Sequence, residues 1–394
     1  MTETTAGDNP HPTPYWRLSG FYFFYFASLG AFLPYWSVYL KSLGFSPRQI
    51  GELIAVVVAT KVVSPNLWAW IADHTGKRMA IVRFGCLVAA LTFTGVFFGN
   101  SYLWIALVML VFSFFWNAAL PQFEATTFNY LRHETHRYSS IRLWGSIGFV
   151  ATVAAMGPLL DYFGTQLLPP VLLVLYLGIW LLSLSVPERE AGHRHQEHVP
   201  LRQVLRRPEV AALLLVCFLM QTSHGPYYAF YTIYMEEHGY SRSWIGQLWA
   251  LGVIAEIAVF MVMHKWVPRF GLRRLLLSAL LLACVRWWVI GMFPDNVILI
   301  TGAQLLHAAS FGVYHAVAIS LIHRYFHGRN QGMGQGLYSS LSFGAGGAVG
   351  SLYSGYLWQA GGNLTFIIAA GISASALLIA WFTRIGAPTA DSAA

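Results

Sequence analysis

Long apolar runs separated by short polar turns repeat along the whole chain. A helix that crosses a bilayer needs about 20 mainly apolar residues, and twelve runs reach that length. They cover residues 16–40, 47–71, 79–99, 102–129, 141–163, 167–187, 209–235, 241–264, 272–293, 296–323, 331–359 and 363–384. A membrane β-barrel would show short segments of alternating hydrophobicity instead. The pattern therefore predicts an all-α membrane protein with twelve transmembrane helices.

The longest polar stretch, residues 188–208, divides the twelve runs into two sets of six. We expect an N-terminal six-helix bundle at 16–187 and a C-terminal bundle at 209–384, joined by a cytoplasmic linker at 188–208. Residues 1–15 have no basic segment or cleavage site typical of a signal peptide. We expect a disordered cytoplasmic tail there, and a second cytoplasmic tail at 385–394.

Composition and charge support this topology. The chain is 56% hydrophobic and 10% charged, whereas soluble domains carry about 25% charged residues. If the N-terminus is cytoplasmic, eighteen of the 24 Lys and Arg residues lie on that side, and only Lys41, Arg48 and Arg242 lie on the other. The positive-inside rule then places both termini in the cytoplasm. The net charge of +8 therefore indicates membrane orientation, and we expect no nucleic-acid partner.

A short basic turn follows the second run and carries Asp73, Gly76, Lys77 and Arg78. It resembles the loop motif G-x-x-x-D-R-x-G-R/K-R of the major facilitator superfamily. Glycine permits a tight turn, and Asp73 can cap a helix or pair with a cation. A similar turn without the acid follows the eighth run, at 264–274. We interpret the first turn as a conformational loop, with a simple topogenic loop as the alternative.

Among the ionisable residues within the apolar runs we single out six: Lys61, Glu124, Arg142, Glu256, Arg286 and His307. A charge at the bilayer centre costs at least ~2.5–3.5 kcal/mol, so such residues usually face a watery cavity and are functional. Three cations against two carboxylates leave one excess positive charge, which favours an anionic ligand. Arginine binds carboxylates through paired hydrogen bonds.

These side chains predict a substrate site with nearby aromatic residues. A short loop makes the runs that carry Glu124 and Arg142 antiparallel neighbours, so we expect these two to be partners. Trp144, Tyr227 and Tyr228 can stack on an aromatic ring, although Trp and Tyr also anchor helices at membrane interfaces. Lys61 can bind substrate or reach an interface along its flexible stem.

Three residues are candidates for proton coupling: Glu256, His307 and His315. A spacing of seven or eight residues returns to the same helix face, so His307 and His315 should face the same way. We expect Glu256 to pair with Arg286 when the site is empty and to take a proton when substrate claims the arginine. Histidine titrates near neutral pH. The alternatives are structural ion pairs and hydrogen-bonded core histidines.

From Phe21 to about Trp381 the chain resembles the oligosaccharide/proton symporters, the lactose permease family. The shared residues are Glu124 in N-A-A-L-P-Q-F-E, Arg142 in R-L-W-G-S-I-G-F, and Glu256, Arg286 and His307 in the second half. The resemblance implies that the first pair holds substrate and that the others couple it to protons. One departure is Ser310, which stands where that family has its proton-carrying glutamate.

A second resemblance is to the phenylpropionic-acid transporter branch of the same superfamily. Its pattern Q-x-x-H-x-x-Y-Y-x-F occurs here as Gln221, His224, Tyr227, Tyr228 and Phe230. This resemblance implies uptake of an aromatic carboxylate and adds Gln221 and His224 to the candidate substrate-binding residues.

We therefore expect a proton-coupled carrier of an aromatic monocarboxylate, such as phenylpropionate, that works by alternating access. It should lie in a bacterial inner membrane as a monomer, with the proton gradient as driving force and no cofactor or metal. The alternatives are a proton symporter for a neutral sugar or nucleoside, a proton-driven exporter and a non-transporting membrane sensor. An enzyme is disfavoured because the sequence offers no nucleophile–base pair, metal cluster or phosphate-binding loop.

Overall fold

The computed structural model describes residues 13–131, 134–189, 201–327, 330–383 and 385–386. Within these ranges the chain forms helices and turns and no strand. Many large apolar side chains cover the outside of the helices, among them Leu103, Leu181, Ile298 and Phe382, which are 58–82% exposed. Such a surface needs an apolar solvent, as a bilayer provides.

Six long helices form the N-terminal half. They are α1 (Tyr15–Ser42), α2 (Pro47–Thr75), α3 (Arg78–Phe93), α4 (Tyr102–Leu131), α5 (Tyr138–Phe163) and α6 (Leu168–Ser185). The short 3₁₀ segment η1 (Thr94–Phe97) extends α3, whereas η2 (Thr135–Arg137) and η3 (Thr165–Leu167) lie in the turns before α5 and α6. Each of the six apolar runs predicted before residue 188 corresponds to one of these helices.

The C-terminal half is more broken. It contains α7 (Leu201–Leu205), α8 (Pro208–Ser223), α9 (Gly225–Glu237), α10 (Arg242–Met292), α11 (Val297–Leu305), α12 (Tyr314–Tyr325), α13 (Asn330–Tyr338), α14 (Gly347–Leu357) and α15 (Gly362–Phe382). Two π-helical segments, η4 (Ala308–Val313) and η5 (Ser339–Gly346), join α11 to α12 and α13 to α14, and a 3₁₀ turn, η6 (Trp358–Ala360), follows α14.

The count of twelve spans is confirmed for the described part of the chain. Ten helices there are long and apolar enough to cross a membrane. One of them, α10, contains two spans, because Gly271 (φ 75°, ψ 153°) interrupts it with a left-handed turn. The path from α13 through η5 to α14 supplies the remaining span.

The ends of the predicted domains differ slightly from the structure. Tyr15, expected in the tail, already belongs to α1, and the end of the predicted linker contains the short helix α7. Ile385 is fully buried, and the Gly386 N–H donates to the Tyr325 hydroxyl at 3.3 Å. Most of both tails and residues 190–200 of the linker lie outside the described residues.

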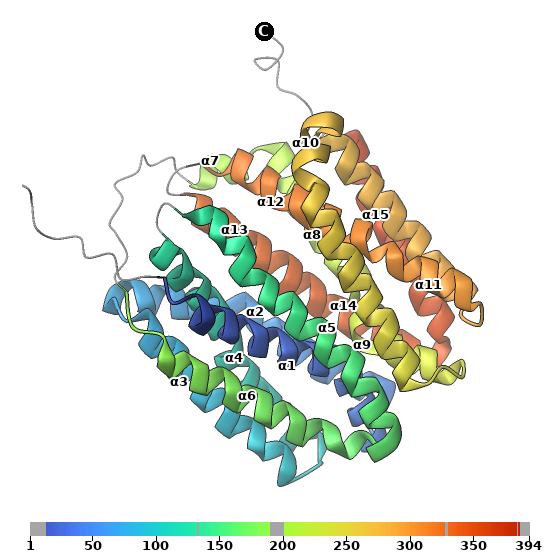
Figure 1. Ribbon diagram of the computed structural model, residues 1–394. Helices are drawn as coiled ribbons and strands as arrows, with labels where there is room; N and C mark the ends of the chain where they lie inside the picture. Colours follow the sequence, from blue (N-terminus) through green and yellow to red (C-terminus); the bar gives the residue numbers. More distant parts are fainter. Residues whose placement is uncertain (1–12, 132–133, 190–200, 328–329, 384, 387–394) are drawn as a thin grey trace, which may run out of the picture.

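The two halves lie side by side, with the blue-to-green helices of the first half next to the yellow-to-red helices of the second (Figure 1). The most extensive contacts between them are those of α5 with α10, α2 with α14, α2 with η5, and α1 with α9. Because the spans alternate in direction and are even in number, α1 begins and α15 ends on one side of the membrane. We call this the terminal side, and the other the opposite side.

The halves touch closely on the opposite side. A Cβ on Gly51 of α2 would lie 2.8 Å from the Gly355 Cα of α14, and a Cβ on Gly157 of α5 would lie 2.4 Å from the Arg242 carbonyl oxygen of α10. Only glycine allows helices to approach this closely. These contacts hold the opposite ends of the two halves together.

Polar contacts reinforce this closure. The Asp161 carboxylate at the end of α5 accepts hydrogen bonds from the Arg242 N–H (3.2 Å), the Ser243 N–H (2.8 Å) and the Ser243 hydroxyl (2.5 Å) at the start of α10. The Tyr356 hydroxyl donates to Glu52 at 2.9 Å, and Lys41 pairs with Glu237 at 2.8 Å. We call these glycine and polar contacts together the seal.

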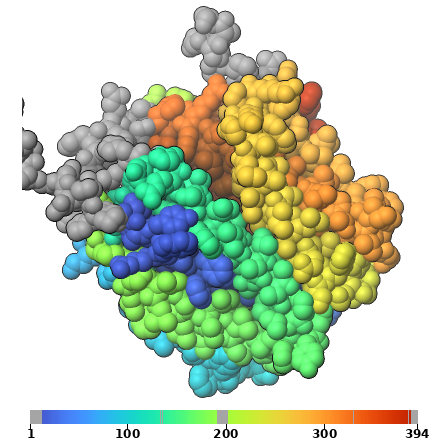
Figure 2. All heavy atoms as spheres, in the orientation of Figure 1, coloured from blue at the N-terminus to red at the C-terminus, as the bar shows by residue number. Residues whose placement is uncertain are grey.

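On the terminal side α5 and α10 diverge (Figure 1). Figure 2 shows a recess between the teal start of α5 and the yellow helix α10, with orange residues of the second half beneath it. With the seal closed on the opposite side and this recess on the terminal side, the structure corresponds to one of the two states that alternating access requires.

Candidate substrate and proton site

Arg142 lies one turn into α5, beside α1. Its guanidinium carbon lies 3.7 Å from the centre of the Phe26 ring and 5.8 Å from that of Tyr22. The side chain is half-buried, and within the described structure no hydrogen bond or ion pair occupies its N–H groups. Arg142 is therefore a cation held in place by aromatic packing, with its five donors free for an anion.

Glu124 of α4 lies close to Arg142 but does not form the expected ion pair with it. The Tyr138 hydroxyl of α5 donates to the Glu124 carboxylate at 3.1 Å. The Arg142 charge is near enough to act on Glu124 electrostatically. The sequence correctly indicates that the two are neighbours, whereas the direct contact belongs to Tyr138.

Arg286 of α10 is fully buried, and neutral acceptors occupy its donors. Nε donates to the Ala303 carbonyl at 3.1 Å, and Nη1 donates to the Ser310 hydroxyl at 3.0 Å. Nη2 lies 3.4 Å from the Gln304 amide oxygen. The guanidinium also lies over the Tyr227 ring at 4.2 Å. Ser310, which replaces an expected glutamate, thus serves here as a hydrogen-bond acceptor for Arg286.

His307 connects Arg286 to Glu256. Its Nδ1 lies 3.0 Å from the Arg286 guanidinium, and its Nε2 lies 3.3 Å from the Glu256 carboxylate. A guanidinium can only donate, so Nδ1 must accept and the ring hydrogen must lie on Nε2, where it faces the carboxylate. The expected direct pair between Glu256 and Arg286 is therefore wrong for this state, because a neutral histidine bridges the two.

The segment η4 places two histidine rings on the same aromatic side chain. His307 and His315 stack on the Phe311 ring with centroids at 5.3 and 5.8 Å and interplanar angles of 7° and 6°. A Cβ on Gly312 would lie 3.2 Å from the Glu256 side chain. The π-helical turn, a feature often found at functional sites, therefore brings the histidine stack and the carboxylate together. His315 also contacts the Tyr338 hydroxyl at 2.8 Å.

Arg142 links the two halves electrostatically. Its charge acts on Glu256 in the second half as well as on Glu124 in the first. The side chain of Glu256 is 17% exposed, whereas Arg286 is completely buried. The accessible charged groups are thus Arg142 and Glu124 of the first half and Glu256 of the second half.

Lys61 lies in the middle of α2 and faces the interior. Thr60, on one side of it, contacts Ser113 and Asn117 of α4, and Val62, on the other, packs against Gly344 of η5. The 56%-exposed Val63 lies about 200° round the helix from Lys61. In the described structure Lys61 has no hydrogen-bond or ion-pair partner.

The three aromatic residues predicted to contact the substrate lie in two different places. The Trp144 indole donates to the Tyr15 hydroxyl at 3.0 Å and contacts Trp16, so the structure places it at the start of α1 and away from the charged residues. Tyr227 is buried, and its hydroxyl donates to Gln304 at 3.0 Å. Tyr228 is half-buried and stacks on the ring of His224 at 5.8 Å.

The charged residues of the loop motif form contacts within the first half. Asp73 pairs with Arg78 across the turn, and Arg78 also donates to Gln122 of α4 at 2.7 Å. Gly76 has the left-handed conformation (φ 69°) and ends α2, while Lys77 is exposed. Gly271 lies in the turn between the eighth and ninth spans and also has a positive φ (75°), although its ψ of 153° differs from that of Gly76; both halves therefore use a glycine at this turn.

Several site residues are absent from the sequence-based set. Phe26 and Tyr138 hold Arg142 and Glu124, Gln304 contacts Arg286, and Phe311 carries the histidine stack. Gln304 and Phe311 lie three and four residues from His307, which places them on or near its helix face. That spacing could have identified them.

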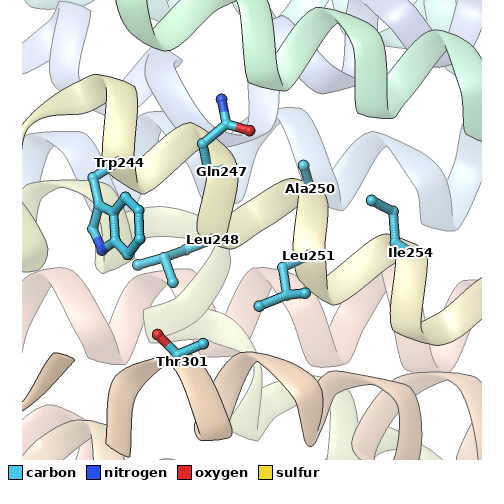
Figure 3. Close-up of a pocket in the computed structure, with 7 residues that line it drawn as sticks. All are labelled: Trp244, Gln247, Leu248, Ala250, Leu251, Ile254 and Thr301. Carbon is cyan, nitrogen blue, oxygen red and sulfur yellow. The ribbon is translucent and has the colours of Figure 1, made fainter. Parts of the chain in front are cut away.

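An apolar groove of about 280 Å³ lies along the outer surface of α10, lined by Trp244, Gln247, Leu248, Ala250, Leu251, Ile254 and Thr301 (Figure 3). No ionisable side chain lines it, and the charged residues described above lie elsewhere. We therefore do not assign the substrate site to this groove.

Twelve spans in two halves, with charged residues from both halves near one recess, define a multi-pass membrane transporter. The chain belongs to the MFS_1 like family of the major facilitator type, whose model matches residues 15–368.

Relatives of this chain are transporters. It is 31% identical to the probable 3-phenylpropionic acid transporter of Escherichia coli (strain K12), over 91% of this chain and 95% of that protein. It is 26% identical to the maltose permease of Geobacillus stearothermophilus, over 88% of this chain and 89% of the permease. The fold matches the crystal structure of the nucleoside transporter NupG with a TM-score of 0.81 at 15% identity, covering 94% of this chain and 98% of that one.

Proposed function

We propose that this transporter imports an aromatic monocarboxylate, such as phenylpropionate, together with a proton. The observation that carries the proposal is Arg142, a cation packed on Phe26 with all its donors free in the described structure. A carboxylate can take two parallel hydrogen bonds from such a guanidinium. The similarity to a probable 3-phenylpropionic acid transporter supports the same class of substrate.

The proton would be carried by Glu256. Its carboxylate faces His307 and is partly exposed, and it is one of the two carboxylates on which the Arg142 charge acts. A substrate carboxylate that binds Arg142 would weaken this support for the Glu256 charge and so favour protonation. The bound proton and the bound anion together are neutral, which lowers the cost of moving them through a dry, occluded state.

We also propose that the terminal side is cytoplasmic in a bacterial inner membrane. The three basic residues of the opposite side are each neutralised: Lys41 by Glu237, Arg48 by Glu52 and Arg242 by Glu236. The unpaired basic residues that orient a membrane protein would then lie mainly on the terminal side. Green fluorescent protein fused after residue 394 should fluoresce, whereas a periplasmic C-terminus would leave it dark.

The substrate assignment is tested with Arg142→Ala. We expect the purified variant to insert normally but to lose at least about 30-fold in affinity for 3-phenylpropionate, since truncating one partner of a charged pair costs ~2 kcal/mol or more. Calorimetry on the wild type and the variant measures this loss.

The matched control is Arg137→Ala. Arg137 pairs with Glu134 at the surface, 2.6 Å away and near the same end of α5, and surface pairs contribute little. Its removal should leave affinity unchanged. Near-normal binding by Arg142→Ala would exclude Arg142 as the anion site, and tight binding of a galactoside or nucleoside instead would favour a neutral substrate.

A further inference from the structure

The imidazole of His224 has a buried acceptor atom without a partner. His224 lies at the break between α8 and α9 and is fully buried. Its Nδ1 is 2.8 Å from the Met220 carbonyl oxygen, and a carbonyl only accepts, so Nδ1 carries the hydrogen. The ring lies close to the Arg286 charge, which disfavours a second buried positive charge. Nε2 is then a bare acceptor, and within the described structure it has no donor.

A buried donor without a partner lies one helical turn away. Gln221 is 2% exposed, and its amide nitrogen also lacks a hydrogen-bond partner among the described residues. Residues three apart on a helix are neighbours on its surface. An acceptor beside a donor matches a hydroxyl group, which donates one hydrogen bond and accepts others.

Aromatic side chains surround this pair. The Trp287 ring meets the His224 ring at 4.8 Å and 87°, Tyr228 stacks on it at 5.8 Å, and Phe311 lies at 6.3 Å. Tyr228 and Phe311 are half-buried, and Phe311 also carries His307. The pair therefore lies behind two aromatic side chains that adjoin the proton-coupling residues, in surroundings suited to an aromatic ring.

We propose that His224 and Gln221 form a subsite for a ring hydroxyl, so that the preferred substrate is a hydroxylated aromatic acid. The phenolic hydroxyl donates to His224 Nε2 and accepts from the Gln221 amide. A site built to bind a hydroxyl discriminates against an analogue that lacks it, because its buried polar groups are then left unpaired. This inference rests on the proposed function and narrows its substrate class.

A ligand series tests the inference on the unmodified protein. Calorimetry on the purified full chain would compare 3-phenylpropionate, its 2-, 3- and 4-hydroxy derivatives, and their methyl ethers. One hydroxy acid should bind at least about tenfold more tightly than the parent, a factor that corresponds to about 1.4 kcal/mol. Its methyl ether, which cannot donate, should lose that advantage.

A pair of variants then locates the effect. His224→Phe keeps an aromatic ring but removes the acceptor, so the ratio of the affinities for the hydroxy acid and for 3-phenylpropionate should fall to about one. The control is His238→Phe, because Nδ1 of His238 makes the same bond to the carbonyl four residues earlier, at 2.8 Å, beside the ring of Tyr234. The control should keep the preference.

The outcomes separate this inference from the proposed function. If 3-phenylpropionate binds but no hydroxy acid binds more tightly, or if the preference survives in His224→Phe, the hydroxyl subsite is refuted. If none of the acids binds the wild type, the proposed function fails and this inference fails with it. The ligand series decides the matter even if His224→Phe does not fold.

Discussion

At the scale of single residues, the two arginines of the site have different roles because their surroundings differ. Arg286 has a neutral acceptor for each of its nitrogen atoms and is completely buried, so it serves as a fixed positive charge behind His307. Arg142 has aromatic packing but no hydrogen bond in the described structure. A substrate anion can therefore reach Arg142 without displacing a partner, whereas binding at Arg286 would leave buried acceptors unpaired.

Glu256 is the proposed proton carrier, and its neutral isostere separates proton coupling from substrate movement. Glu256→Gln should lose uphill accumulation while retaining exchange of substrate across the membrane. The glutamine side chain can still accept from His307 at the position of the 3.3 Å contact, but it cannot carry a proton. Exchange and accumulation are measured in the same vesicles with labelled substrate, and equal loss of both would show that Glu256 is structural or binds substrate instead.

Sequence reasoning identified the charged residues but not all of their contacts. Ionisable residues in apolar runs are conspicuous because burial of a charge is costly, and this sufficed to find Arg142, Glu256 and Arg286. The direction in which each side chain points is harder to predict from the sequence. Trp144 is two residues from Arg142, which places it on the other side of the helix, and the structure accordingly joins it to Tyr15.

At the scale of elements, the broken helices of the second half position the residues that we propose for proton coupling. A regular α-helix repeats every 3.6 residues, and η4 departs from that repeat between His307 and His315. Apolar periodicity cannot predict a π-helical turn, since one inserted residue hardly changes the composition. The bridge formed by His307 was therefore not predictable, although the spans that carry its members were.

The contact between α5 and α10 depends on the Asp161 carboxylate. Asp161 caps the N-terminus of α10 from the other half, and loss of such a cap costs ~1 kcal/mol. In the Asp161→Ala variant the seal should therefore open several-fold more often than in the wild type. A cysteine at Ser37, which is 3% exposed near the end of α1, should then react correspondingly faster with an impermeant maleimide added on the opposite side.

Asp295→Ala is the control for this effect. Asp295 is an exposed acid on the same side that takes no part in the seal, so its removal should not change the labelling rate. If Asp161→Ala labels no faster than this control, the cap does not hold the two halves together.

At the scale of the whole molecule, the structure combines a closed opposite side with an open terminal side (Figure 2). Twelve spans and two halves were predictable, because runs of about 20 apolar residues identify membrane helices. The state of the molecule was not, since it depends on close approaches such as Gly51 to Gly355, between residues far apart in the chain. An alternating-access carrier must break these contacts to expose Arg142 and Glu256 to the other side.

The central claim is that charged residues from both halves form one site that moves an acid and a proton together. Its most direct test is uptake of 3-phenylpropionate by the purified protein in liposomes with a more acidic exterior. The account predicts accumulation above the external concentration with simultaneous alkalinisation of the medium, and loss of both in Arg142→Ala. Uptake that does not respond to the pH gradient, or substrate binding without any flux, would contradict it.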